Sequence, residues 1–130
     1  MVVIPDDVRR VLDQPVYAHL ATVSPDGSPQ VSVIWIERDG DLVRFGTAEG
    51  RVKVRNMRHD QRVMLSLTPP GNPGRNITIR GHVAELVANG TALMDRLARK
   101  YEGAERFREL EPGEVRLDAT IEVDRVSDAG

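Results

Sequence analysis

The stretch YAHLATVSPDGSPQVSVIWIERDGDLVRFGT, residues 17–47, decides the fold of this chain. Apolar and polar residues alternate along it with a period of two, which is the pattern of half-buried strands. Two turn signals interrupt the alternation, Pro25-Asp26-Gly27-Ser28 and Asp39-Gly40. We therefore expect an antiparallel meander of three strands, at residues 16–24, 29–37 and 42–47.

On both sides of this meander the spacing of apolar residues alternates between that of helices and that of strands. Pro5, followed by two aspartates, predicts a helix at residues 5–14, which Pro15 ends. Gly81 interrupts a later strand and suggests a bulge or the close approach of another backbone. The remaining expected elements are strands at 62–68, 76–87 and 115–126, a helix at 91–101, another helical turn at 105–110, and an exposed loop at 69–74.

Together these elements predict one mainly β domain with flanking helices over residues 1–130. Its six strands follow one another without helical crossovers, so the sheet should be antiparallel. A closed or nearly closed barrel is the economical way to remove the edges of such a sheet. The sequence has no internal repeat or linker that would mark a second domain.

The composition narrows the class of protein. The formal net charge is −2 and aromatic residues make up 4% of the chain. Nucleic-acid binders are more often basic, with stacking aromatics between their cations, so we expect no nucleic-acid partner. Cysteine is absent, which excludes disulfides and thiolate sites. The N-terminus has no basic region before an apolar run, and no window is long enough to span a bilayer, so we expect a cytoplasmic protein without a membrane partner.

Motifs for catalysis by protein side chains are also absent. His19, His59 and His82 lack the spacing of metal ligands, so no metal site is predicted. The sequence contains no nucleophile elbow, phosphate loop or dinucleotide fingerprint. We assign no catalytic side chain, and any chemistry on a small-molecule substrate would belong to a bound cofactor.

A basic segment follows the third strand, within residues 45–62. Five of the chain's 18 lysines and arginines lie in it, namely Arg51, Lys53, Arg55, Arg58 and Arg62. If the segment is helical from Gly50, its arginines form one stripe. Basic side chains beside the N–H groups of a helix start form an anion site, whereas a charge run can also be a solvated helix face.

Four pieces of the sequence together resemble one known family. They are the N-terminal helix with LATVSPDGSP at 20–29, the strand at 31–36, the run FGTAEGRVKVRNMRHD at 45–60, and the strand around Gly81. The chain resembles the split β-barrel proteins related to pyridoxamine 5′-phosphate oxidase, and within them the branch that uses the deazaflavin coenzyme F420. The resemblance covers nearly the whole chain. It implies a six-stranded antiparallel split β-barrel, like that of FMN-binding proteins, in a homodimer with the cofactor at the interface.

The resemblance also implies which residues hold the cofactor. Thr47 and Lys53 would bind its phosphate, and Arg51 would bind the phosphate or the oligoglutamate tail. Arg55 and Asn56 match the next positions of the F420 branch. Backbone groups of the second strand would support the ring, and the partner subunit would contribute the start of the fifth strand. The expected set is Ser32, Val33, Ile34, Thr47, Arg51, Lys53, Arg55 and Asn56, with Arg75, Asn76 and Ile77 from the partner.

The sequence departs from pyridoxamine 5′-phosphate oxidase itself in the second strand. Ser32 and Glu37 stand near the places where that enzyme carries an arginine and a lysine. The basic segment instead suits a longer polyanion such as coenzyme F420, because arginines bind phosphates and carboxylates through charged hydrogen bonds. The expected function is an F420-dependent reductase that transfers hydride to an electron-poor double bond of a small organic substrate. The alternatives are an FMN-binding oxidoreductase like pyridoxamine 5′-phosphate oxidase, and a carrier of flavin or deazaflavin without turnover.

Overall fold

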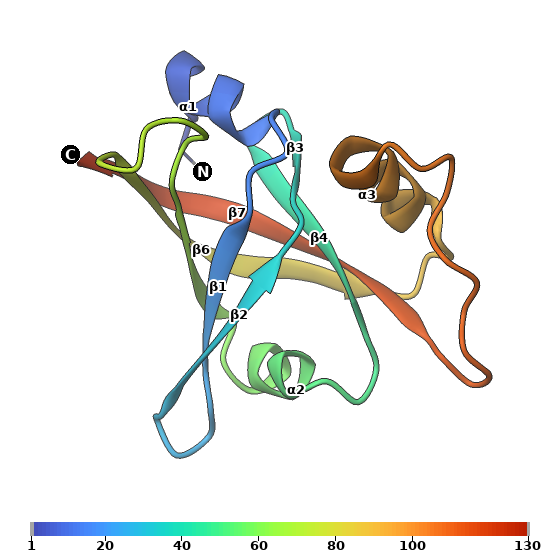
Figure 1. Cartoon of the computed structure of the whole chain (residues 1–130). Helices are drawn as coiled ribbons and strands as arrows, with labels where there is room; N and C mark the ends of the chain where they lie inside the picture. Colours follow the sequence, from blue (N-terminus) through green and yellow to red (C-terminus); the bar gives the residue numbers. More distant parts are fainter. Residues whose placement is uncertain (1, 130) are drawn as a thin grey trace.

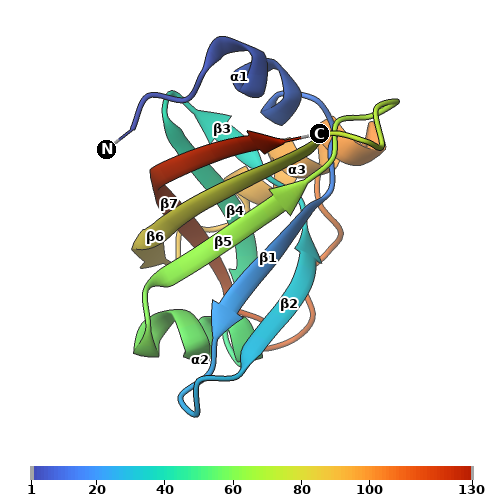
Figure 2. The same ribbon diagram turned by 90° about the vertical axis from the view of Figure 1, so that its left-hand side faces the viewer.

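The computed structural model describes residues 2–129 as one antiparallel sheet of seven strands with three helices (Figure 1). The elements are α1 (Asp6–Leu12), β1 (Ala18–Val23), β2 (Pro29–Ile34), β3 (Glu37–Asp39), β4 (Leu42–Ala48), α2 (Val52–His59), β5 (Arg62–Leu67), β6 (Asn76–Val87), α3 (Ala92–Glu102) and β7 (Arg116–Ala129). The strand order is β2-β1-β5-β6-β7-β4-β3. Only two residues separate the edge strands β2 and β3 in the chain, so the sheet curls and brings its edges together (Figure 2). The expected split β-barrel fold is confirmed.

The first hairpin forms as its turn signal predicts. Ala18 lies opposite Ile34, and Val23 lies opposite Pro29. In the turn, the Asp26 carboxylate accepts hydrogen bonds from the backbone N–H (3.0 Å) and the hydroxyl (2.6 Å) of Ser28. A bond from an aspartate side chain to the backbone two residues further on mimics a backbone turn and fixes the reversal of the chain.

The strand expected at 29–37 is broken, which is why seven strands are present where six were predicted. Its interruption lies at Trp35 and Ile36. The Ile36 N–H donates to the Tyr101 hydroxyl (3.0 Å), and the Ile36 carbonyl accepts from the Lys100 ammonium (2.8 Å). Side chains of α3 therefore satisfy backbone groups that a neighbouring strand would otherwise pair, and the short strand β3 begins after them.

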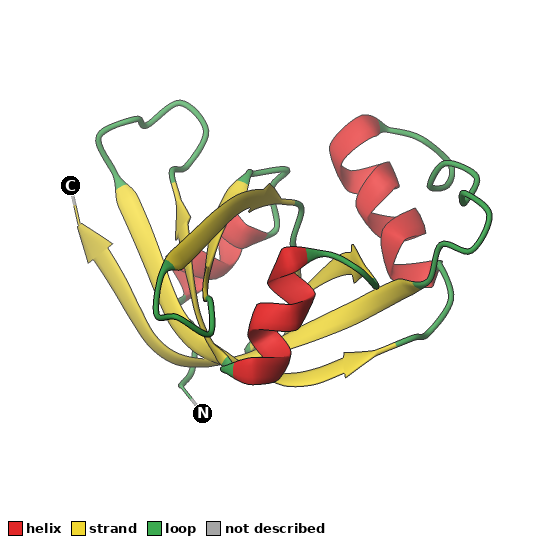
Figure 3. Cartoon of the chain, turned by 90° about the horizontal axis from the view of Figure 1, so that it is seen from below, coloured by secondary structure: helices red, strands yellow, loops and turns green. Residues whose placement is uncertain are grey.

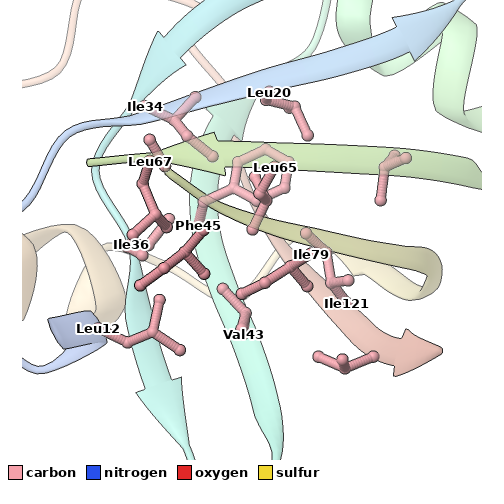
Figure 4. Close-up of a cluster of buried hydrophobic side chains, with 14 of the residues drawn as sticks. Leu12, Leu20, Ile34, Ile36, Val43, Phe45, Leu65, Leu67, Ile79 and Ile121 are labelled. Carbon is pink, nitrogen blue, oxygen red and sulfur yellow. The ribbon is translucent and has the colours of Figure 1, made fainter. Parts of the chain in front are cut away.

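The curled sheet encloses the hydrophobic core (Figure 4). Several strands contribute side chains with no exposed surface, including Leu20, Phe45, Leu65, Ile79 and Ile121. The helix α1 lies at one end of the barrel and α2 at the other, while α3 lies outside, beside β4 (Figure 1, Figure 3). The two ends of the barrel are thus covered by different helices, and α2 carries the basic segment.

The bulge expected at Gly81 is confirmed. The register between β6 and β7 shifts between Arg80 and Gly81. A Cβ atom at position 81 would collide with the backbone carbonyl of Glu122 on β7. Glycine therefore permits the close approach of the two strands.

Two expectations nearer the C-terminus are wrong in detail. Residues 105–110 form no helical turn, because α3 side chains hold this loop in place. Asp95 accepts the Phe107 N–H (2.9 Å), and Arg99 donates to the Glu105 carbonyl (2.7 Å). The last strand continues to Ala129 instead of ending at 126, because it pairs with the start of β6.

The three helices are short. Within residues 2–129, none has the length and apolar character required to cross a membrane.

Candidate functional site

A pocket of about 250 Å³ opens where the end of β2, the end of β4, the start of α2, one face of α3 and the start of β7 meet. One part of its lining is cationic and another part is apolar. The lining residues are Val33, Ile34, Trp35, Gly46, Thr47, Arg51, Lys53, Met94, Leu97 and Arg116.

Five of the residues expected to bind the cofactor line this pocket. Val33 and Ile34 end β2, Thr47 is buried near the end of β4, and Arg51 and Lys53 belong to the start of α2. The pairing of β4 with β7 fixes the position of Thr47, which lies opposite Leu117. The structure thus brings together residues from two strands and a helix, as the resemblance implied.

Two cations of the pocket, Arg51 and Lys53, lack carboxylate partners among the described residues. Within residues 2–129, no aspartate or glutamate lies within ion-pair distance of Arg51 or Lys53. Lys53 is half-buried, and its burial, together with the nearby Arg51 and Arg116, lowers the pKa of its ammonium. Half-buried cations that repel one another gain most from a bound anion. The arrangement is therefore that of an anion site.

Other cations of the basic segment are already neutralised. Arg58 binds Glu49 through two hydrogen bonds (2.8 and 2.5 Å), and Arg62 pairs with Asp60 (2.7 Å). The Arg62 side chain is 80% exposed. These two arginines fit the solvated-face reading of the charge run, whereas Arg51 and Lys53 do not.

The structure places Arg55 and Asn56 away from this pocket. Arg55 lines a separate groove of about 390 Å³ beside Gly50 and Arg51. Asn56 is completely buried, and its amide donates to the hydroxyls of Thr22 (3.0 Å) and Ser24 (3.2 Å). Asn56 therefore fastens α2 to β1 and the turn that follows it.

The residues expected from the partner subunit also lie away from the pocket of their own protomer. Arg75 pairs with Asp128 (2.6 Å) and Asp7 (2.9 Å), and the Asn76 side-chain oxygen accepts from Ser66 (3.0 Å). Ile77 is buried in the barrel core. Their contribution to a partner's pocket stays a prediction.

Ser32 and Glu37, which replace cations of pyridoxamine 5′-phosphate oxidase, have other surroundings in this chain. The Ser32 hydroxyl is buried and has no hydrogen-bond partner among residues 2–129. The Glu37 carboxylate binds Arg96 of α3 through two contacts of 2.6 and 3.0 Å. Neither side chain lines the pocket.

The apolar wall of the pocket is held by α3. Met94 and Leu97 face the pocket, and Trp35 stacks on Tyr101 with ring centroids 5.2 Å apart. Next to this stack, the Lys100 ammonium donates to the carbonyls of Leu12 (2.7 Å) and Ile36. Burial lowers the pKa of Lys100 to about 8. The helix α3 is thus attached to the segment at residues 35–36, which also forms the edge of the pocket.

Four residues that line the pocket, and the side chain of a fifth, were not predicted from the sequence. Gly46, Met94, Leu97 and Arg116 were not placed at the site, and Trp35 was expected to contribute only backbone. Helical spacing put Met94 and Leu97 on one apolar face, but such spacing is the same for a core face and a pocket wall. Arg116 carries no signal in the sequence, because it stands at an ordinary polar position at the start of a strand.

Metal-ligating groups do not gather in the structure. Among residues 2–129, no group of three or more histidines, aspartates or glutamates is arranged to hold a metal ion.

An apolar surface patch borders the pocket. Tyr17, Val31 and Val33 are 57%, 60% and 56% exposed on the outer face of the β1–β2 hairpin. Val33 belongs to both the patch and the pocket lining. An exposed group of large apolar side chains at a pocket rim is typical of an interaction surface.

Comparisons with known proteins identify the family. Residues 4–123 match the sequence profile of pyridoxamine 5′-phosphate oxidase. The solved structure of an F420 reductase is 32% identical, with a TM-score of 0.86 over 95% of this chain and 98% of that one. A pyridoxamine 5′-phosphate oxidase-related, FMN binding protein from Nostoc punctiforme shares the fold at 16% identity, with a TM-score of 0.69 over 98% and 86% of the two chains.

General Stress Protein 26 from Bacillus anthracis shares the fold at 15% identity, with a TM-score of 0.67 over 95% and 92% of the two chains. No curated protein sequence matches this chain. The profile match and the 32% identity confirm the resemblance expected from the sequence. The chain belongs to the pyridoxamine 5′-phosphate oxidase family.

Proposed function

We propose that this chain is a homodimeric reductase that uses coenzyme F420. The observation that supports the proposal is the convergence of Thr47, Arg51 and Lys53 on one pocket that also has an apolar wall. Unpaired cations suit the phosphate and the tail carboxylates of this cofactor, and an apolar wall suits its flat ring. The 32% identity to an F420 reductase points in the same direction.

Each part of the pocket has its own role in this proposal. Lys53 donates to the phosphate, Arg51 reaches the phosphate or the tail, and the Thr47 hydroxyl supplies a neutral donor. Backbone groups of β2 and the side chains of Trp35 and Leu97 orient the ring and exclude water. Bound in its reduced form, coenzyme F420 would supply a hydride from ring carbon C5 to an electron-poor double bond of the substrate and would itself be oxidised.

The size of the pocket supports a second copy of the chain at the site. Pockets for ligands of this size usually measure about 300–1,000 Å³, and one protomer offers about 250 Å³. The patch formed by Tyr17, Val31 and Val33 lies at the pocket rim. A partner seated there would bury apolar surface and complete the pocket, with Arg75, Asn76 and Ile77 as its contribution.

FMN is the second candidate cofactor. The observation in its favour is that Arg51 and Lys53 face one small cavity, which suits a single phosphate group. In that case the protein is an FMN-dependent oxidoreductase.

Titration of the purified protein with coenzyme F420 and with FMN tests the proposal. We expect a change in F420 fluorescence that saturates at one cofactor per protomer, and weaker binding of FMN. Tighter binding of FMN, or a yellow protein as purified, would favour the second candidate. Binding of neither cofactor would refute both.

A turnover assay then separates the reductase from the carrier. Reduced coenzyme F420 is mixed with the protein and a panel of enones and quinones, and its reoxidation is followed by absorbance. Enzyme-dependent reoxidation with at least one acceptor is expected. Binding without reoxidation across the panel would point to a carrier.

A further inference from the structure

Arg116 enters the pocket from β7, a different side from α2. It lies opposite Ala48 in the β4–β7 ladder, and its side chain is only 8% exposed. One nitrogen, Nη1, donates to the Glu114 carboxylate (3.1 Å). The other, Nη2, lies 3.5 Å from the Met94 sulfur, and Nε is buried without a hydrogen-bond partner among residues 2–129.

The Arg116 guanidinium is therefore paired with a carboxylate through Nη1, while Nε and Nη2 have no oxygen acceptor among the described residues. Nε and Nη2 form the edge through which arginine binds phosphates and carboxylates with two parallel hydrogen bonds. Among the residues that the structure describes, this edge of Arg116 meets only the thioether of Met94, which is a weak acceptor. Buried hydrogen-bond donors in native proteins almost always have a partner. The missing acceptor at this edge of Arg116 is therefore one that a bound ligand can provide.

The orientation of Arg116 is fixed from its opposite side. Glu114 also accepts two hydrogen bonds from Arg108 (2.9 Å each) and one from the Glu111 N–H (2.8 Å). The Phe107 ring lies 5.1 Å below the Arg116 guanidinium. With its carboxylate partner and a ring in place, the arginine is preorganised and the edge formed by Nε and Nη2 is held at the pocket.

We propose that Arg116 is a third cationic anchor of this site, whose Nε and Nη2 donate to the phosphate group of the cofactor that Lys53 and Arg51 reach from α2. This inference rests on the proposed function. Met94 acts as the cover of the arginine edge, and its side chain turns aside when the ligand enters. Methionine suits that task because its side chain is unbranched and flexible. Gly46 provides the space that the Met94 side chain occupies, because a Cβ at position 46 would collide with the Met94 sulfur.

The test compares ligands with and without a phosphate group. FMN and riboflavin differ by the phosphate alone, whereas the deazaflavin alcohol lacks the oligoglutamate tail of coenzyme F420 as well as its phosphate. Wild type, Arg116→Gln and Arg116→Lys are titrated with coenzyme F420 and its phosphate-free deazaflavin alcohol, and with FMN and riboflavin. Arg10→Gln is the charge-matched control, because Arg10 is exposed on α1, outside the pocket. For Arg116→Gln we expect affinity for the phosphorylated ligand to fall about 10- to 100-fold, with no comparable loss for its phosphate-free counterpart. Arg116→Lys keeps the positive charge but loses the paired Nε and Nη2 donors. Its affinity for the phosphorylated ligand should lie between those of wild type and Arg116→Gln.

If Arg116 served only to hold the loop that carries Phe107 and Glu114, the result would differ. Equal loss for both members of a ligand pair would overturn the inference, as would unchanged affinity of Arg116→Gln for F420 and FMN. If Arg116→Gln fails to fold by circular dichroism, the ratio of the two affinities in Arg116→Lys decides between the same outcomes. Absence of binding by the wild type would refute the proposed function and this inference together, whereas a bound wild type with an unaffected variant refutes the inference alone.

Discussion

Replacement of Lys53 by methionine tests the anion site most directly. The change Lys53→Met removes the ammonium and keeps most of the apolar stem. A hydrogen bond to a charged group is worth about 1.5–3 kcal/mol, so affinity for coenzyme F420 should fall about 10- to 150-fold. Arg58→Met on the same helix is the matched control, since Arg58 is already paired with Glu49 at the surface.

The same substitution should leave the cofactor-free protein folded. Lys53 is half-buried beside Arg51 and Arg116, and burial and these like charges lower the pKa of its ammonium. Its charge therefore costs free energy in the folded state, and its removal relieves that cost. We expect a thermal midpoint equal to or slightly above that of wild type without cofactor, and a lower midpoint than wild type with saturating F420.

Fluorescence titration and thermal unfolding together check the reasoning. Unchanged F420 affinity in Lys53→Met would remove Lys53 from the site. An equal loss of affinity in Arg58→Met would show that general charge, and not the pocket, attracts the cofactor. A strong fall in the cofactor-free midpoint would mean that Lys53 is a structural residue.

Three further predictions concern other parts of the molecule. Asn56→Ala should lower the free energy of unfolding by about 1–3 kcal/mol, because two buried hydrogen bonds to hydroxyls are lost; urea titration with an unchanged midpoint would contradict this. The folded-state pKa of Lys100, lowered from 10.5 to about 8, means that the unfolded chain binds more protons between those values. Stability should therefore rise with pH in that window for wild type relative to Lys100→Met, as measured by denaturant midpoints; a flat difference would oppose it. Val33→Glu should place a charge in the apolar patch and convert the proposed homodimer into monomers in sedimentation experiments, with loss of F420 affinity; a dimer of unchanged mass would exclude this face as the interface.

The parts of the fold that depend on neighbouring residues could be predicted from the sequence. The turn at Asp26 and Gly27 and the bulge at Gly81 follow from local chemistry that any reader of the chain can see. The break at Ile36 could not be predicted, because its cause is Tyr101, 65 positions further along the chain. The same holds for residues 105–110, whose backbone is held by side chains of α3.

The candidate site shows the same division. Thr47, Arg51 and Lys53 lie within a few residues of one another, so a single motif indicated all three. Arg116 reaches them only through the pairing of β4 with β7, which the sequence does not encode as a local pattern. Asn56 belongs to the same motif as Lys53, yet a helix turns its side chain inward to the β1 contact, and the motif alone does not distinguish these directions.

The two residues between β2 and β3 link the mechanics of the barrel to its pocket. Trp35 and Ile36 join the two edges of the sheet, and Trp35 also lines the pocket. Lys100 and Tyr101 of α3 hold this two-residue segment through hydrogen bonds to the Ile36 backbone. Local unfolding that releases α3 would therefore remove the hydrogen-bond partners of the Ile36 backbone and one wall of the pocket together. A ligand that fills the pocket would therefore slow hydrogen exchange at the Ile36 N–H and along α3, as well as at the pocket itself.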